Sequence, residues 1–230
     1  MKSRIFVIII FTFFVGKVYN APTINLNDNN PKTTNGQKEL SDAQAIKVLS
    51  KVYKSYASYS SLKMNIDITI KDGDFSYKKS GKASVKGEQY KLETRDESII
   101  SNGKTLWIYL KGDNSLQITN ATANDQNLFC YPALLLQKYQ KYCVVEFLRS
   151  EGNDYVLQFT SYNENCPYQK ITVNINKSNY TISKIEASET SETSYLINVK
   201  NIEKNKTINQ TAFSFDEKKV AQSKIQDFRF

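Results

Sequence analysis

The sequence predicts a mainly β protein with one large, strongly curved antiparallel sheet, a barrel or part-barrel, with two helices on its concave side. Three observations lead to this fold class. Segments with a hydrophobic period of two fill most of the chain after Leu62. Short turns rich in Gly, Asn and Asp join these segments as hairpins. Only two stretches have helical character, and strands do not alternate with helices as they do around a parallel sheet.

The first residues predict export from the cytoplasm. Met1–Arg4 is basic and Ile5–Val15 carries no charge, which is typical of a secretory signal peptide and too short to span a bilayer. We expect cleavage near Val18–Ala21, so that residues 1–20 are the signal peptide. Residues 21–40 are rich in Asn, Thr and Lys and predict a flexible segment. Residues 41–230 are expected to form one domain.

A first helix is expected from Ser41 to about Tyr59, because Ser41 and Asp42 are both N-cap candidates. Its apolar positions step by three and four residues along one face: Ile46, Leu49, Tyr53 and Tyr56. Such a stripe either packs on the sheet or covers a concave sheet and lines part of a ligand cavity.

From Leu62 the period changes to two. Leu62–Ile70 alternates between apolar and polar positions, as a strand with one buried face does. Further strands are expected at Phe75–Lys86, Gln89–Thr94, Glu97–Ser101, Lys104–Tyr109, Leu116–Ile118, Val144–Arg149, Tyr155–Thr160, Gln169–Asn176, Thr181–Ser188, Ser194–Glu203, Phe213–Phe215 and Gln226–Arg229.

The hairpin around Asn102-Gly103 is apolar on both faces. Asn-Gly between two β-rich segments is a strong hairpin signal because both residues tolerate a positive φ. In the second strand one face carries Leu106, Ile108 and Leu110, and the other carries Trp107 and Tyr109. Such a hairpin either lies under a cover or lines a cavity.

A second helix is expected from about Pro132 to Lys141, since proline fits the first turn of a helix. Leu134–Leu136 makes it apolar almost all round, which a surface helix would not tolerate. It is therefore either a core helix or a plug in the mouth of a barrel.

Composition argues against catalysis and nucleic-acid binding. The chain has no histidine, which removes the His-dependent nucleophile systems and the commonest metal ligand. Its net charge of +8 is scattered and forms no stripe. We expect no catalytic residue, metal or cofactor. Three cysteines, Cys130, Cys143 and Cys166, predict one disulfide and one free thiol, and all three pairings stay open.

A sheet of about ten to twelve strands encloses more space than a small barrel fills with side chains, so an apolar cavity is expected. An exported apolar container without catalytic groups is a carrier. We predict that its lipid-binding lining comprises Leu49, Tyr53, Tyr56, Met64, Ile66, Ile68, Tyr90, Leu92, Ile100, Trp107, Tyr109, Leu134, Leu135 and Tyr139.

The segment Asp96–Tyr109, D-E-S-I-I-S-N-G-K-T-L-W-I-Y, resembles the hallmark D-E-S-I-x-x-S-D-G-K-T-L-W-x-Y of the outer-membrane lipoprotein carrier protein family (LolA type), and is one residue shorter before the turn. The Lys-, Asn- and Ile-rich character is similar to members from the Bacteroidetes lineage. Further similar segments are Lys51–Met64, Gly81–Glu93, Tyr155–Leu157, Ile171–Ile175 and Phe213–Asp216.

The resemblance implies a monomeric periplasmic carrier with helices forming a lid over an unclosed barrel. Such carriers take triacylated lipoproteins from an inner-membrane ABC transporter and pass them to an outer-membrane acceptor. Proteobacterial members carry an arginine tied to lid closure where this chain has Val85–Glu88. Lysine does not reproduce a bidentate guanidinium contact, so Lys86 is only a candidate for the lid latch.

Two other functions stay open. A module of the same fold could bind another amphiphile or act as a sensor of lipoproteins. A hydrolase of lipid esters would need a Ser, Thr or Cys nucleophile that works without histidine.

Overall fold

The computed structural model describes residues 42–121, 136, 140, 142–163, 166, 168–189 and 191–229. The predicted signal peptide and flexible segment lie outside these residues, as does most of the predicted second helix. Within that helix, Leu136 is helical and buried, and Gln140 donates a backbone hydrogen bond of 2.9 Å to the Leu136 carbonyl.

The described part is mostly β-structure with one α-helix, α2 (Ala43–Ala57). Its strands are β1 (Leu62–Asp72), β2 (Phe75–Lys86), β3 (Gln89–Thr94), β4 (Glu97–Ser101), β5 (Thr105–Leu110), β6 (Ser115–Asn120), β7 (Cys143–Glu151), β8 (Asp154–Ser161), β9 (Tyr168–Asn176), β10 (Ile182–Glu189), β11 (Thr193–Lys204) and β12 (Ile225–Asp227). Three short 3₁₀ helices precede β12: Gln210–Phe213, Glu217–Lys219 and Gln222–Lys224.

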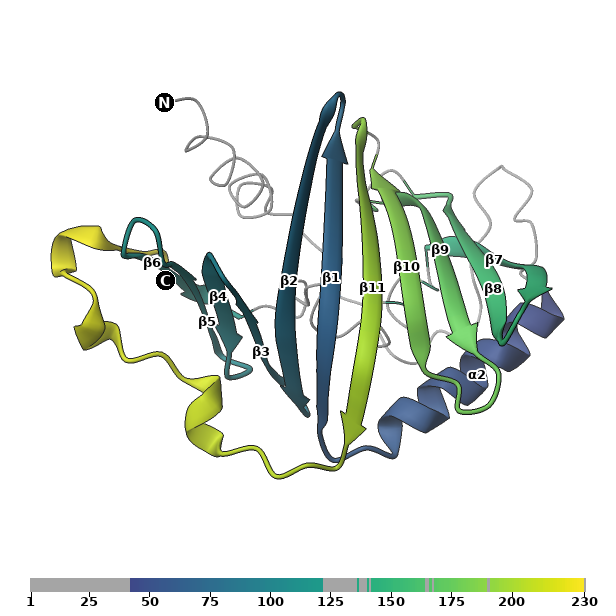
Figure 1. Ribbon diagram of the computed structural model, residues 1–230, viewed down its shortest axis with the longest axis horizontal. Helices are drawn as coiled ribbons and strands as arrows, with labels where there is room; N and C mark the ends of the chain where they lie inside the picture. The colour runs from purple at the N-terminus through teal and green to yellow at the C-terminus, as the bar shows by residue number, and fades with distance from the viewer. Residues whose placement is uncertain are drawn as a thin grey trace. The chain divides into compact units, whose positions relative to one another are not determined.

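All the strands belong to one 12-stranded sheet, in the order β12-β6-β5-β4-β3-β2-β1-β11-β10-β9-β8-β7 (Figure 1). Two meanders build it, β1 to β6 and β7 to β11, and the long β1–β11 ladder joins them. Every pairing is antiparallel except that of β12 with β6. Since β12 and β7 are separate edges, the sheet does not close, which confirms the predicted unclosed β-barrel.

The curved sheet needs local irregularities in its ladders. Register shifts occur between Lys63 and Asn65 in β1 and between Phe147 and Arg149 in β7, and such bulges bend a strand and increase its twist. At Gly81 in β2 an added Cβ would lie 2.8 Å from the Glu93 carbonyl oxygen of β3. Glycine therefore allows a close approach of two strands at this point.

The first helix forms as the sequence predicts. Asp42 is its N-cap, and the carboxylate accepts a hydrogen bond of 2.6 Å from the Gln44 backbone N–H. The same residue also binds the edge strand β7: its backbone N–H donates to the Val145 carbonyl (2.8 Å), and its carboxylate accepts from Phe147 N–H (3.3 Å). One residue thus starts the helix and covers part of an open sheet edge.

Two local predictions need correction. Phe213–Phe215 is not a strand: Phe213 ends a 3₁₀ helix, and Ser214 begins an extended segment outside the sheet. In the β4–β5 hairpin Lys104 belongs to the turn, because the Asn102 side-chain oxygen accepts hydrogen bonds from the backbone N–H groups of Lys104 and Thr105, both 2.8 Å. These contacts start the second strand one residue later, at Thr105.

Candidate functional site

The register of the ladders assigns every strand residue to one of two sheet faces. Residues directly opposite each other in an antiparallel pair point to the same face. Met64 lies opposite Ala83, Ala83 opposite Leu92, Leu92 opposite Ile99, and Ile99 opposite Ile108. All five are at most 3% exposed. We call this side the inner face and the other the outer face.

The inner face continues across the second meander. Ile68 lies opposite Ile197, Ile197 opposite Ile185, Ile185 opposite Val173, and Val173 opposite Leu157. Each of these side chains is at most 1% exposed. An unbroken apolar row therefore crosses the sheet from β1 to β8, and together with the row from Met64 to Ile108 it makes the inner face the main hydrophobic surface of the fold.

Predicted site residues on the inner face are Met64, Ile66, Ile68, Tyr90 and Leu92. The second meander contributes inner-face residues that sequence reasoning did not include: Val145, Leu157, Phe159, Ile171, Val173, Ile175, Ile185, Ile197 and Val199. The sequence pattern that indicates them is the alternation of apolar and polar residues along each strand, for example at Ile171, Val173 and Ile175.

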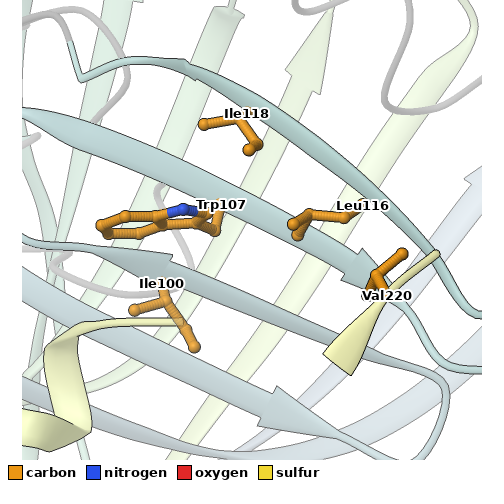
Figure 2. Packing of buried hydrophobic residues seen from close by; sticks show 5 residues of the cluster. All are labelled: Ile100, Trp107, Leu116, Ile118 and Val220. Carbon is orange, nitrogen blue, oxygen red and sulfur yellow. The ribbon is translucent and has the colours of Figure 1, made fainter. Parts of the chain in front are cut away.

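Ile100, Trp107 and Tyr109 lie on the outer face, so the prediction that they share a lining with Met64 and Leu92 is wrong. Ile100 lies opposite Trp107, and Trp107 opposite Ile118, whereas Ile108 belongs to the inner row. Figure 2 shows how Ile100, Trp107, Leu116 and Ile118 gather on this side with Val220. The hairpin is apolar on both sides because it contributes to two separate hydrophobic clusters.

The C-terminal segment covers the outer-face cluster. Val220 is 5% exposed and packs into it, while the rings of Phe215 and Tyr109 contact each other in a tilted arrangement with centroids 5.0 Å apart. Trp107 Nε1 donates a hydrogen bond of 2.9 Å to Glu217 Oε1. These contacts occupy the outer face of β4 to β6 with the protein's own chain.

Helix α2 lies beside the second meander (Figure 1). Leu49 and Tyr56 are buried on it, together with Ala45, Val48 and Val52, and Tyr53 is half-buried. The observed stripe is thus rotated slightly from the predicted one, and Ile46 is only half-buried. A helix with one buried apolar stripe packs that stripe on the buried side of the sheet, which here is the inner face.

Polar contacts hold α2 at both ends and near its middle. Asp42 binds β7 as described above. Near the other end, the Ile182 backbone N–H donates 3.1 Å to Tyr56 Oη, and Ser55 Oγ donates 3.1 Å to the Asn179 carbonyl. Lys51 Nζ also donates 2.9 Å to Tyr180 Oη. Tyr53 Oη is buried and makes no hydrogen bond to the described residues, and burial raises the pKa of Tyr53.

One ion pair interrupts the inner face. Lys79 Nζ binds Glu97 Oε1, and the two side chains are 11% and 3% exposed. Lys79 lies opposite Ile68, so the pair is on the apolar side of the sheet. Glu97 Oε2 is buried and has no hydrogen-bond partner among the described residues. A buried pair of this kind is costly to desolvate and costly to break.

The structure does not place the remaining predicted site residues on this surface. Leu134, Leu135 and Tyr139 lie outside the described residues. Lys86 is exposed at the end of β2 and borders a pocket of about 260 Å³ with Ser60, Ser61 and residues 205–208. No ion pair of Lys86 occurs within the described ranges, and its role as a latch stays a prediction.

The described residues hold no cluster of three or more His, Cys, Asp or Glu side chains suited to a metal ion. In the same part of the chain, no helix combines the length and apolarity needed to cross a membrane.

Comparison with known proteins gives the family. The family model described as "Outer membrane lipoprotein carrier protein LolA" matches residues 60–216, and no curated protein sequence matches the chain. Similar solved structures include an uncharacterized conserved protein from Thermus thermophilus (11% identity, 81% of this chain and 99% of that one, TM-score 0.50). Another is a LolA superfamily protein from Nitrosomonas europaea (14% identity, 74% of this chain and 97% of that one, TM-score 0.42). A third is the lipoprotein LppX from Mycobacterium tuberculosis (11% identity, 74% of this chain and 99% of that one, TM-score 0.46). Because the family model covers more than half of the sequence, this protein belongs to the LolA family of outer membrane lipoprotein carrier proteins.

Proposed function

We propose that this protein is a periplasmic carrier that shields the acyl chains of lipoproteins on the inner face of its sheet. The observation that carries the proposal is the broad apolar inner face, which extends from Ile108 in β5 to Leu157 in β8 and is interrupted by the Lys79–Glu97 pair. Transfer of an acyl chain out of water gains about 0.8 kcal/mol for each buried CH₂ group. A broad apolar surface supplies this energy without any specific polar contact.

Binding requires the inner face to become accessible, because its residues are buried in the described state. Helix α2 is suited to move, since it is joined to the sheet region by individual hydrogen bonds, at Asp42, Lys51, Ser55 and Tyr56. We propose that displacement of α2 exposes the apolar surface and that its buried stripe, with Leu49 and Tyr56, then contributes to the lining. A cover of this kind also allows release, which a rigid and fully enclosed cavity would oppose.

In this proposal residues 1–20 direct export, and the mature chain is a periplasmic monomer. It receives triacylated lipoproteins from an inner-membrane ABC transporter and delivers them to an outer-membrane acceptor. Membership of the carrier family supports this direction of transfer. If the inner face instead holds a free lipid or another amphiphile, the protein is a binding module or a sensor.

Native mass spectrometry of the protein purified from its own host tests the proposal. A stoichiometric triacylated lipoprotein is the expected ligand. A free phospholipid or a reproducibly empty protein would contradict the carrier function and favour the alternative.

A matched pair of substitutions tests the surface itself. Leu92 on the inner face and Leu116 on the outer face are both fully buried leucines, so Leu→Ala at either position has a similar cost in stability. With a fluorescent acyl probe, we expect Leu92→Ala to weaken binding and Leu116→Ala to leave it unchanged. Equal effects, or weakening by Leu116→Ala alone, would refute the inner face as the site.

A further inference from the structure

Two of the three cysteines are brought together at the end of the second meander. Cys143 is the first residue of β7, and Cys166 precedes β9. The two residues are 4% and 8% exposed. Both thiols are free, and each is the largest influence on the pKa of the other through a side-chain hydrogen bond, so the two side chains are neighbours.

The surrounding contacts place both sulfurs at one point of the fold. Cys143 lies opposite Ser161 in the β7–β8 ladder, and the Ser161 hydroxyl accepts a hydrogen bond of 3.1 Å from the Asn163 backbone N–H. The Cys166 backbone N–H donates 3.0 Å to the Asn163 carbonyl, and its thiol donates 3.2 Å to the Tyr168 carbonyl. Cys166 is therefore held against Cys143 by backbone contacts on both sides, without any covalent bond.

We propose that Cys143 and Cys166 form a disulfide that fastens the edge strand β7 to the segment between β8 and β9. β7 has only one neighbour in the sheet, β8, so a covalent bond at its first residue adds a second attachment. Cys143 is on the same face as Val145, opposite Phe159, which places the bond at the border of the inner face. This inference extends beyond the cargo of the protein and does not depend on it.

The oxidant is a second disulfide, either of a protein thiol oxidoreductase or of a small thiol such as glutathione. The Cys166 thiolate attacks one sulfur of that disulfide, which forms a mixed disulfide and releases one thiol. The Cys143 thiol then loses its proton and attacks the Cys166 sulfur, which forms the Cys143–Cys166 bond and releases the second thiol. Two thiols of the protein are oxidised and one disulfide of the oxidant is reduced to two thiols.

The acid–base properties of the pair agree with this order of attack. The hydrogen bond from Cys143 lowers the pKa of Cys166, and the same hydrogen bond raises the pKa of Cys143. Cys166 is therefore the more readily deprotonated of the two thiols.

Peptide mapping of the full chain tests the pairing. The purified protein is equilibrated with glutathione and glutathione disulfide, alkylated with N-ethylmaleimide in acid, digested without reductant and analysed by mass spectrometry. We expect a linked peptide pair containing Cys143 and Cys166, with Cys130 alkylated. A disulfide that includes Cys130, or alkylation of all three cysteines, would overturn the proposal. Because the oxidant is added in solution, the result is independent of where the protein resides and of its ligand.

Thermal unfolding gives a second readout with a matched control. A disulfide that closes the loop between Cys143 and Cys166 should raise the Tm of the oxidised protein by roughly 10 °C over that of the reduced protein. Cys130→Ser should keep that difference, and the double variant C143S/C166S should remove it. Loss of the difference in Cys130→Ser, with retention in the double variant, would contradict the assignment.

Discussion

Trp107 in β5 donates a hydrogen bond of 2.9 Å from Nε1 to Oε1 of Glu217, although the two residues are 110 positions apart in the chain. This contact fixes the C-terminal segment on the outer face of β4 to β6, where Val220 is buried beside Trp107. It also gives the tryptophan a packing role on the outer face. The first prediction tests this cover.

Val220→Ala should destabilise the protein by about 2 kcal/mol, because it removes buried methyl groups from the outer-face cluster. Lys219→Ala is the control, since its side chain is exposed, and it should have little effect. Trp107 is the only tryptophan, so its fluorescence in urea reports the release of the segment directly. An unchanged unfolding midpoint in Val220→Ala would show that the segment does not stabilise the sheet.

Loss of one partner of the Lys79–Glu97 pair should lower the free energy of unfolding more than loss of both partners. Lys79→Met leaves a carboxylate buried on the inner face and should cost about 3–5 kcal/mol. The double variant K79M/E97M should recover most of that loss. Lys200→Met serves as control, because its partner Asp67 is on an exposed part of the outer face, and it should cost about 0–1 kcal/mol. Denaturant unfolding measures all three, and equal losses in the two single variants would argue against a buried pair.

Gly81 should be intolerant of a side chain. A Cβ at this position would lie 2.8 Å from the Glu93 carbonyl oxygen and 3.0 Å from Leu92 Cδ1, so Gly81→Ala should destabilise by about 1–3 kcal/mol. At Gly112 nothing lies within 4 Å of an added Cβ, and Gly112→Ala should be nearly neutral. Thermal unfolding compares the two, and similar melting temperatures would mean that β2 and β3 can separate at little cost.

Acid should remove a contribution that Glu93 makes to stability. Partial burial raises the pKa of Glu93, but hydrogen bonds from Lys111, Lys91 and Ser98 outweigh it, so the net pKa lies below the usual range. A lowered folded-state pKa stabilises the protein above the ordinary Glu pKa, and this stabilisation disappears as the pH falls through the folded value.

Glu93→Gln should therefore be less stable than the natural protein at about pH 7, and the difference should shrink towards about pH 3. Urea unfolding at several pH values measures it. A difference that stays constant with pH would mean that Glu93 contributes through packing rather than charge.

The contact between Tyr56 and Ile182 should control access to the inner face. Tyr56→Phe removes the acceptor of the Ile182 N–H, and we expect faster hydrogen exchange at Ile182 and faster binding of an acyl probe. Tyr59→Phe is the matched control, because the Tyr59 hydroxyl pairs with Ser55 of the helix itself. If binding slows in Tyr56→Phe, α2 is part of the binding surface in its present position and does not act as a movable cover.

The repetitive parts of the fold could be predicted from sequence because their signals are local. The alternation in Leu62–Ile70 and the turns after β2 and β3 gave the bounds of β2, β3 and β4 correctly. The N-cap at Asp42 could also be predicted from the sequence, because it depends on neighbouring residues only.

The side of the sheet on which Trp107 lies could not be read from its own hairpin, because every residue of β4 is buried and both faces are apolar. The face follows from register carried through several ladders, from Met64 to Ile108. The partner that covers Trp107 comes from Glu217 and Val220, far along the chain, and no local pattern indicates it. The contact of Cys143 with Cys166 likewise depends on how the second meander folds.

Photo-crosslinking with an acyl chain that carries a terminal diazirine tests the central claim most directly. After irradiation of the loaded protein, peptide mapping locates the insertions. We predict insertions at inner-face residues of both meanders, such as Leu92, Ile108 and Ile197. Insertions confined to Trp107, Leu116 and Val220 on the outer face would contradict the claim that the inner face holds the acyl chains.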